Sequence, residues 1–218
     1  MRRKPNLIAR LEKCEHLLVS KPELLCGNWL DTYPYEKIYI ELGCGRGQFA
    51  IELAKMNPNT LIVAIEKSDN VIVSALERAV SEGTQNVRFI IAMADNLTDY
   101  FAPGEASQIY INFCDPWPAN RHIKRRLTHK SFLERYLTVL QEDGEVHFKT
   151  DNIDLFEYSL DEFESCGFSL HDISRDLHKN GIVGLMTEYE TKFHDLGMPI
   201  AHCIATISRL RHCEEPAG

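Results

Sequence analysis

The sequence lacks the long apolar runs that a membrane protein needs: no stretch of its 218 residues approaches the roughly 20 consecutive apolar residues of a spanning helix. The basic first residues also lack the apolar core of a signal peptide. The seven cysteines contain no CxxC pair, so neither a disulfide framework nor a zinc site is indicated. We therefore expect a cytoplasmic protein with reduced thiols, without a bound metal and without a membrane partner.

The chain also lacks an excess of positive charge. Its formal net charge of −8 argues, on its face, against a nucleic-acid partner. Net charge is a poor guide when the cations are clustered, because a ligand meets the local field. Cations gather at Arg2–Lys4 and at 121–126, where five cationic or protonatable side chains occupy six positions. These clusters are candidate phosphate contacts, and two solvated surface runs are the simpler alternative.

Short apolar runs alternate with segments of helical periodicity along most of the chain. Runs of β-branched and aromatic residues are typical of buried strands, and apolar residues three or four positions apart are typical of helices that cover a sheet. The order indicates an α/β fold. Thr128 is expected to cap a helix that ends at Asp143-Gly144. The expected strands are residues 37–42, 61–65, 87–92, 108–113, 145–149, 168–173 and 201–207.

A glycine turn follows the first of these strands and precedes a helix, as at the start of a doubly wound nucleotide-binding fold. Gly43 and Gly45 let a ligand approach the backbone closely. Glu66 ends the second strand about 20 residues later, where an acid is placed to bond ribose hydroxyls. The turn alone is a weak signal, but the turn and the acid together indicate an adenosine cofactor.

Acids at four strand ends narrow the choice of cofactor. They would repel the pyrophosphate of a dinucleotide but complement the sulfonium and ammonium groups of S-adenosylmethionine. The pattern therefore favours a methyltransferase over a dehydrogenase. The four acids are Glu41, Glu66, Asp95 and Asp115.

The segment after the third strand is the usual place for groups that contact adenine. Asp95 or Asn96 could accept from its exocyclic amine, and the backbone around Met93 could serve equally. Alternatively, Asp95 and Asn96 only cap the short helix expected at 97–101. The pattern leaves these alternatives open.

Six segments occur in a fixed order along the chain: ELGCGRG at 41–47, IEKS at 65–68, NFCDPWP at 112–118, RHIKRRLT at 121–128, FKTDN at 148–152 and TEYETKF at 187–193. In them the chain resembles the bacterial tRNA (guanine-N7)-methyltransferases, which methylate a guanosine in the tRNA variable loop. The DPWP, RHIKRR and TEYE segments are far more specific than the glycine turn. The resemblance implies a Rossmann-like class I S-adenosylmethionine-dependent fold, with a seven-stranded, mostly parallel sheet, an antiparallel last strand and helices on both faces.

The resemblance implies a methyltransferase domain at 37–210, an N-terminal extension at 1–36 and a tail at 211–218. It assigns the methyl donor to Glu41, Glu66 and Asp115. Asp115 is the candidate catalytic group, because positive charge moves from sulfur to the base during transfer. The resemblance assigns tRNA contacts to Asp151, Thr187, Glu188, Tyr189 and Glu190.

Two further groups of residues complete the expected site. The cationic phosphate contacts are Arg121, Lys124, Arg125 and Arg126. Many members of the family have lysine where this chain has Ala119, and an acid where it has Met93. For Asp151 and Glu190 the alternatives are helix capping or a surface ion pair. Two rival functions stay open: a methyltransferase with another acceptor, and a non-catalytic RNA-binding module. The sequence does not distinguish a monomer from a homodimer.

Overall fold

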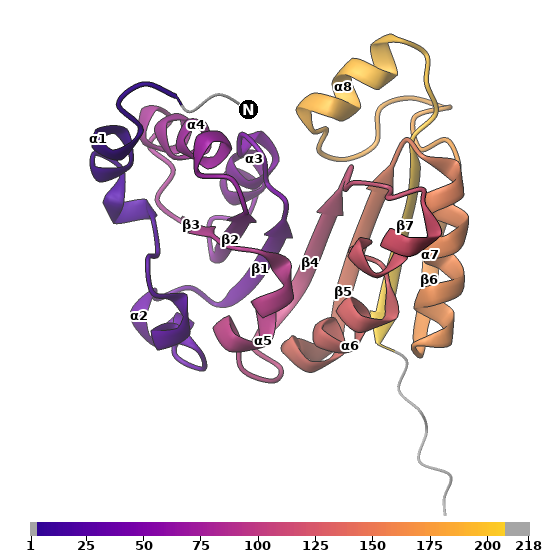
Figure 1. The fold of residues 1–218 in the computed structure, drawn as a ribbon, viewed down its shortest axis with the longest axis horizontal. Helices are drawn as coiled ribbons and strands as arrows, with labels where there is room; N and C mark the ends of the chain where they lie inside the picture. The colour runs from indigo at the N-terminus through magenta and orange to yellow at the C-terminus, as the bar shows by residue number, and fades with distance from the viewer. Residues whose placement is uncertain (1–3, 208–218) are drawn as a thin grey trace, which may run out of the picture.

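A computed structural model describes residues 4–207, in which strands and helices alternate along the chain (Figure 1). Within these residues seven strands form one sheet in the order β3-β2-β1-β4-β5-β7-β6. β7 runs antiparallel to both β5 and β6, and the other pairs are parallel. The predicted fold class is thereby confirmed. The strands are β1 (Lys37–Leu42), β2 (Thr60–Glu66), β3 (Val87–Ile91), β4 (Ala106–Asn112), β5 (Leu140–Thr150), β6 (Phe168–Ser174) and β7 (Ala201–Ile207).

Helices cover both faces of the sheet because successive strand residues point to opposite sides. Ile40 of β1 belongs to the core that contains Phe156, whereas the adjacent Tyr39 belongs to the core that contains Phe49. α3 (Gln48–Met56) and α4 (Asp69–Ser81) cover the face of Tyr39. The opposite face is covered by α5 (Leu97–Tyr100), α6 (Lys130–Val139) and α7 (Ile153–Ser165).

The residues before β1 pack onto the sheet and α4. Leu7 and Trp29 are buried, and the indole of Trp29 donates to Tyr100 O at 2.8 Å. Arg10 makes two hydrogen bonds to the Glu77 carboxylate, at 2.7 and 2.6 Å. This segment holds α1 (Leu7–Glu12), the 3₁₀ turns η1 (Glu15–Leu17) and η2 (Pro22–Leu25), and α2 (Trp29–Thr32).

The cap predicted for α6 was wrong. His129 is the N-cap residue, and its Nδ1 accepts from the Ser131 amide at 3.1 Å. Thr128 is instead fully buried, and its hydroxyl accepts from Ser159 Oγ at 2.7 Å. The imidazole nitrogen of His129 accepts from a free backbone amide of the first helical turn, so Thr128 is not needed as a cap. Its hydroxyl makes a polar contact inside the core instead.

The predicted end of α6 at Asp143-Gly144 was also wrong, because the helix ends at Val139 and β5 begins at Leu140. Gly144 does not have the left-handed φ of a C-terminal glycine cap. A Cβ at this position would lie 2.9 Å from Gln141 O and from Leu140 Cβ. A glycine is therefore required here because residues 140–144 of β5 approach one another closely. This irregular part of β5 lies opposite a register shift in β4.

Candidate active site

The glycine turn after β1 has a backbone that side chains would strain. Gly43, Gly45 and Gly47 have φ values of 78°, 56° and 75°, in the left-handed region. The Gly43 and Cys44 amides donate to Ile65 O at 2.8 and 3.1 Å, which fixes the turn to the end of β2. A Cβ built at Gly43 or Gly45 meets no atom within 4 Å, so the turn borders open space that a ligand can fill.

Glu41 lies at the end of β1 beside this turn. It is 3% exposed, and its Oε1 accepts from Asn112 Nδ2 at 3.3 Å. Its buried Oε2 has no hydrogen-bond partner among the described residues. Burial raises the pKa of Glu41 to about 7; the Asn112 side-chain amide and the Ala50 backbone amide oppose this rise, and the nearby Glu66 carboxylate adds to it. A buried, unpartnered carboxylate oxygen fits a cationic ligand that would complete its interactions.

Glu66 ends β2 and holds the loop on either side of it. Its Oε2 accepts from the Gly45 amide at 3.3 Å, and its Oε1 accepts from the Ser68 amide at 2.9 Å. The carboxylate therefore stands directly against the glycine turn and is only partly buried. Its position fits the ribose contact predicted for it.

Asp115 follows β4 through a tight turn in which Phe113 and Trp117 have positive φ values of 52° and 41°. Bulky residues seldom adopt this conformation, so the surrounding structure holds the turn. The Asp115 side chain is 65% exposed, and its Oδ2 lies 3.6 Å from Lys67 Nζ. Lys67 adjoins Glu66, so this exposed ion pair connects the ends of β2 and β4.

The chain after β3 forms a 3₁₀ turn, η3 (Ala94–Asn96), which leads into α5. Met93 is 59% exposed, and Asp95 and Asn96 are also exposed. Asn96 is the N-cap of α5 but makes no side-chain cap; its Nδ2 donates to the Tyr100 hydroxyl at 3.3 Å. Asp95 and Asn96, the two side chains predicted as alternatives for the adenine contact, are thus accessible at the edge of the sheet.

The basic run divides into exposed and buried cations. Arg121, Lys124 and Arg125 are exposed, as is Ala119 before them. Arg126 is only 9% exposed; its guanidinium donates to Pro116 O at 2.9 Å and to Trp117 O at 3.3 Å and stacks on the Tyr158 ring. Arg126 therefore stabilises the turn after β4 through these hydrogen bonds.

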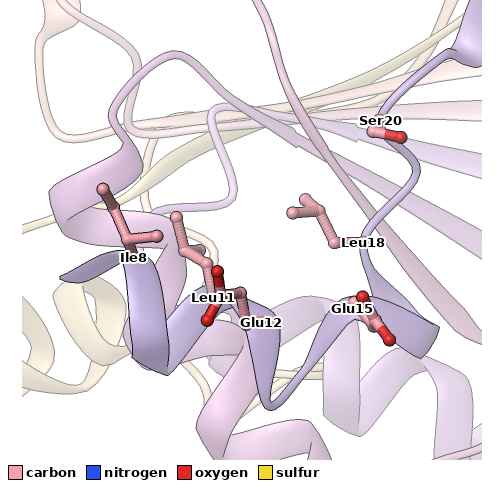
Figure 2. A pocket seen from close by; sticks show the side chains of 6 residues that line it. All are labelled: Ile8, Leu11, Glu12, Glu15, Leu18 and Ser20. Carbon is pink, nitrogen blue, oxygen red and sulfur yellow. The ribbon is translucent and has the colours of Figure 1, made fainter. Parts of the chain in front are cut away.

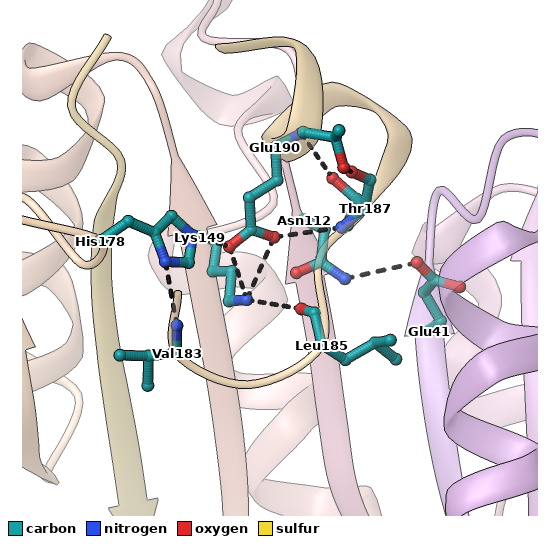
Figure 3. Close-up of polar contacts among 9 residues, drawn as sticks. Glu41, Asn112, Lys149, His178, Val183, Leu185, Thr187 and Glu190 are labelled. Atoms are coloured by element: carbon teal, nitrogen blue, oxygen red, sulfur yellow. Dashed lines mark hydrogen bonds and ion pairs between the residues drawn. The ribbon is translucent and has the colours of Figure 1, made fainter. Parts of the chain in front are cut away.

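Helix α8 (Glu188–Asp195) lies above the ends of β4 and β5 in Figure 1, and Figure 3 shows its contacts. Thr187 caps the helix by accepting from the Glu190 amide at 3.0 Å. Glu190 is fully buried and pairs with Lys149 and His178 at 2.9 and 2.8 Å. Both of the alternatives considered for Glu190, helix capping and an ion pair, are therefore present, and the pair is buried rather than at the surface.

The remaining predicted substrate residues are accessible. Tyr189 is 62% exposed, and its ring lies 6.3 Å from that of Phe113. Glu188 Oε1 pairs with the Arg78 guanidinium of α4 at 2.8 Å. Asp151 is exposed directly after β5. Tyr189 thus lies beside the turn after β4, and Asn112 connects the end of this strand to Glu41.

Sequence reasoning missed four residues of this arrangement. Lys67 directly follows Glu66, and Asn112 stands shortly before Asp115. Their positions beside predicted acids at strand ends could have identified them as site residues. Lys149 was also visible, as a cation at the end of a buried strand. His178 carried no local signal, because it stands in a loop 12 residues before its partner Glu190.

A cavity of about 420 Å³ lies elsewhere, along the N-terminal segment (Figure 2). None of the predicted site residues lines it; its lining is Ile8, Leu11, Glu12, Glu15, Leu18 and Ser20. Between residues 4 and 207, no helix has the length and apolarity to cross a membrane. The same residues hold no group of three or more His, Cys, Asp or Glu side chains arranged to bind a metal ion.

Solved structures of several methyltransferases share the fold. The 16S rRNA methyltransferase KamB is 15% identical, with 95% of each chain covered and a TM-score of 0.62. A variant of the 16S rRNA (adenine(1408)-N(1))-methyltransferase from Catenulisporales acidiphilia is 13% identical, with 85% of this chain and 92% of that chain covered and a TM-score of 0.59. Precorrin-6y C5,15-methyltransferase from Geobacter metallireducens is 14% identical, with 95% and 94% covered and a TM-score of 0.56.

These likenesses concern the fold, which is that of class I S-adenosylmethionine-dependent methyltransferases. The family evidence is separate and covers most of the chain: residues 35–203 match the family described as "Putative methyltransferase". The open turn and the unpartnered Glu41 oxygen fit S-adenosylmethionine, the methyl donor that the family and fold imply. The chain therefore belongs to this methyltransferase family.

Proposed function

We propose that the protein transfers a methyl group from S-adenosylmethionine to N7 of a guanosine in the variable loop of tRNA. The main support for this proposal is that the sequence segments on which the resemblance rests meet at one edge of the sheet. The Phe113 amide donates to Lys149 O at 2.9 Å, which joins the DPWP and FKTDN segments. The Lys149–Glu190 pair joins FKTDN to TEYE. Asn112 joins all of them to Glu41 in the donor site.

On the donor side, we assign the ribose to Glu66 and the cationic part of the donor to Glu41 and Asp115. The open space beside Gly43 and Gly45 admits the donor to the backbone. Exposed groups at the end of β3, namely Met93, Asp95 and Asn96, would border the adenine. Bound S-adenosylmethionine supplies an electrophilic methyl group on a sulfonium.

The chemistry demands alignment more than proton removal. Guanine N7 already exposes a lone pair, so no general base is required. Positioning of two reactants can lower a barrier by about 7–11 kcal/mol in favourable cases. Because positive charge moves from sulfur to the base, a carboxylate that faces the purine stabilises the transition state more than the free base. Asp115 is our candidate for this role, since it is accessible and follows the strand beside Glu41.

An RNA acceptor is supported by the exposed cations and by the similar structures. Two of the structures named above are 16S rRNA methyltransferases. N7 lies in the deep, narrow groove of A-form RNA, so the target base must be unpaired or turned outward. Arg121, Lys124 and Arg125 stand exposed for the phosphates beside such a base. We assign the guanine N1–H and N2 amine to Asp151, which is exposed directly after β5, and Tyr189 presents an exposed ring beside Phe113.

The test is to incubate the protein with unmodified tRNA and labelled S-adenosylmethionine and to map the labelled base. We expect label at N7 of a variable-loop guanosine. A transcript carrying 7-deazaguanosine is the matched control, because it keeps the Watson–Crick edge and lacks the nucleophilic nitrogen; it should remain unlabelled. Label on an exocyclic amine, or no label in any tRNA, would refute the proposal.

A second measurement tests the phosphate contacts. Three exposed cations predict a log–log slope of tRNA affinity against salt of about −2, at roughly 0.7 for each contact with single-stranded RNA. A flat salt response would favour a small-molecule or protein acceptor. Equilibrium dialysis with labelled S-adenosylmethionine tests the other rival, because a non-catalytic RNA-binding module without donor affinity would bind no label, and such a result would refute the proposed enzyme.

A further inference from the structure

The buried carboxylate of α8 has no free oxygen to offer a substrate. Glu190 Oε1 accepts from Lys149 Nζ at 2.9 Å and from His178 Nε2 at 2.8 Å (Figure 3). Its Oε2 accepts from Lys149 Nζ at 3.1 Å and from the Thr187 amide at 3.2 Å. Three donor groups of the protein therefore make four hydrogen bonds to the two oxygens of a side chain that is 0% exposed.

Lys149 and His178, the two side-chain partners of Glu190, each make a further hydrogen bond within the protein. The Lys149 ammonium is buried, and besides Glu190 it donates to Leu185 O at 3.0 Å. His178 Nδ1 accepts from the Val183 amide at 3.2 Å, so the imidazole is neutral and donates to Glu190 through Nε2. One cation, one anion and one neutral ring thus form a closed network that joins β5, the loop before α8, and α8 itself.

Little else holds this helix. α8, all of which the structure describes, buries only the Glu190 side chain. The Arg78–Glu188 pair is half-exposed, with side chains 34% and 38% accessible. Pairs of this kind contribute about 1 kcal/mol or less, whereas breaking a buried pair costs several times more. Ring contacts add to the attachment: Phe113 lies 6.3 and 6.0 Å from the rings of Tyr189 and Phe193, and the rings of His178 and His194 lie 5.5 Å apart.

We propose that Lys149, His178 and Glu190 are positioning residues that hold α8 against the ends of β4 and β5, and that Glu190 does not read the guanine. The network places Tyr189, the neighbour of Glu190, over Phe113. Lys149 stands two residues before Asp151, so the same strand end positions the helix and the exposed acid. Recognition of the guanine N1–H and N2 amine then falls to Asp151. This inference rests on the proposed function for its substrate.

A double-mutant cycle on tRNA methylation tests the proposal. Lys149→Met and Glu190→Gln should each raise the KM for tRNA about tenfold, keep kcat within threefold and keep the donor Kd within twofold. Because each acts through the other, the double variant should show about the same tenfold rise. A hundredfold rise in the double variant, or a normal KM in Lys149→Met, would overturn the proposal.

An inosine substitution separates positioning from base reading. Inosine keeps N7 but lacks the N2 amine, so a carboxylate that accepts from this amine distinguishes the two bases. We expect Glu190→Gln to retain the wild-type ratio of kcat/KM for guanosine over inosine, and Asp151→Asn to lose most of it. Loss of that ratio in Glu190→Gln would show that Glu190 contacts the base.

Hydrogen exchange tests the network without any acceptor. Amides of residues 185–196 should exchange at least tenfold faster in Lys149→Met and in Glu190→Gln, while β1 and α3 keep their protection. Glu52→Gln removes the same charge from an exposed pair with Lys55 and should leave residues 185–196 unchanged. If tRNA is not the acceptor, wild-type protein gives no methylation, yet this measurement still decides whether the network holds α8. Unchanged exchange in both network variants would refute the positioning role.

Discussion

The glycine turn beside β1 and helix α8 face the same site but are held in place by different forces. The turn is fixed by backbone hydrogen bonds and rests on apolar packing, since Gly47 lies against Ala75 and Phe89. α8 packs few apolar side chains and depends on one buried ion pair. Apolar packing is non-directional and tolerates small shifts, whereas a buried pair requires one geometry. The donor side is therefore preformed, and the α8 side depends on the integrity of a single polar network.

The largest expected effect is on the packing of the donor side. Gly47→Ala should lower the free energy of unfolding by about 3 kcal/mol, because the left-handed φ strains the residue and its Cβ would lie 2.5 Å from Ala75 Cβ. Gly83→Ala is the matched control: its φ is 67°, but nothing lies within 4 Å, so about 1 kcal/mol is expected. Urea unfolding measures both. Equal losses would mean that packing under the turn contributes nothing.

The next effect concerns the acid that touches the turn. Glu66→Ala should raise the donor Kd about fiftyfold, because charge-assisted hydrogen bonds contribute about 1.5–3 kcal/mol. Turnover at saturating donor should change little. Equilibrium dialysis and steady-state kinetics measure the two quantities, with Glu66→Gln as the milder variant. A large fall in turnover at unchanged donor affinity would show that Glu66 is misplaced in this scheme.

The pH dependence of donor binding probes the buried acid. In the proposed function the ionised carboxylate of Glu41 complements the cationic donor, and its pKa of about 7 leaves it mostly neutral at pH 6. Donor affinity should therefore increase about eightfold between pH 6.0 and 7.5, as the ionised fraction rises. Glu41→Gln should bind more weakly, with a flat profile over this range. A steep profile in Glu41→Gln would assign the titration to another group.

The smallest effect separates two neighbouring cations of the basic run. Arg125→Gln should weaken tRNA binding about threefold at 0.15 M salt and reduce the salt slope by about 0.7. Loss of the contact of its guanidinium with the Trp117 ring, at 4.9 Å, should lower the free energy of unfolding by about 0.5 kcal/mol. Arg126→Gln should leave the slope unchanged and lower the free energy of unfolding by about 1 kcal/mol, because it removes hydrogen bonds to the turn after β4. Identical salt slopes in Arg125→Gln and the wild type would remove Arg125 from the RNA contacts.

The sheet could be predicted from local patterns because strands and helices differ in apolar period, and the described strands other than the 11-residue β5 are short and bounded. The end of α6 could not be predicted in this way. Asp143-Gly144 has the composition of a turn, yet Gly144 serves close approach within β5, which depends on the neighbouring strand. The prediction of Thr128 as a helix cap failed for a similar reason, because its hydroxyl contacts Ser159, which lies 31 residues away in the sequence.

The sequence alone determined which chemistry is present. Acids at strand ends, glycines in the turn and a basic run are local features, and the alternation of strands brings strand ends to one edge. Only the tertiary structure decided which of these groups are free to act. Arg126 and Arg125 are adjacent and equally charged, yet one is buried in the turn and the other is exposed. Glu190 and Lys149 are 41 residues apart, and their pairing depends on burial and long-range contact, which no local pattern encodes.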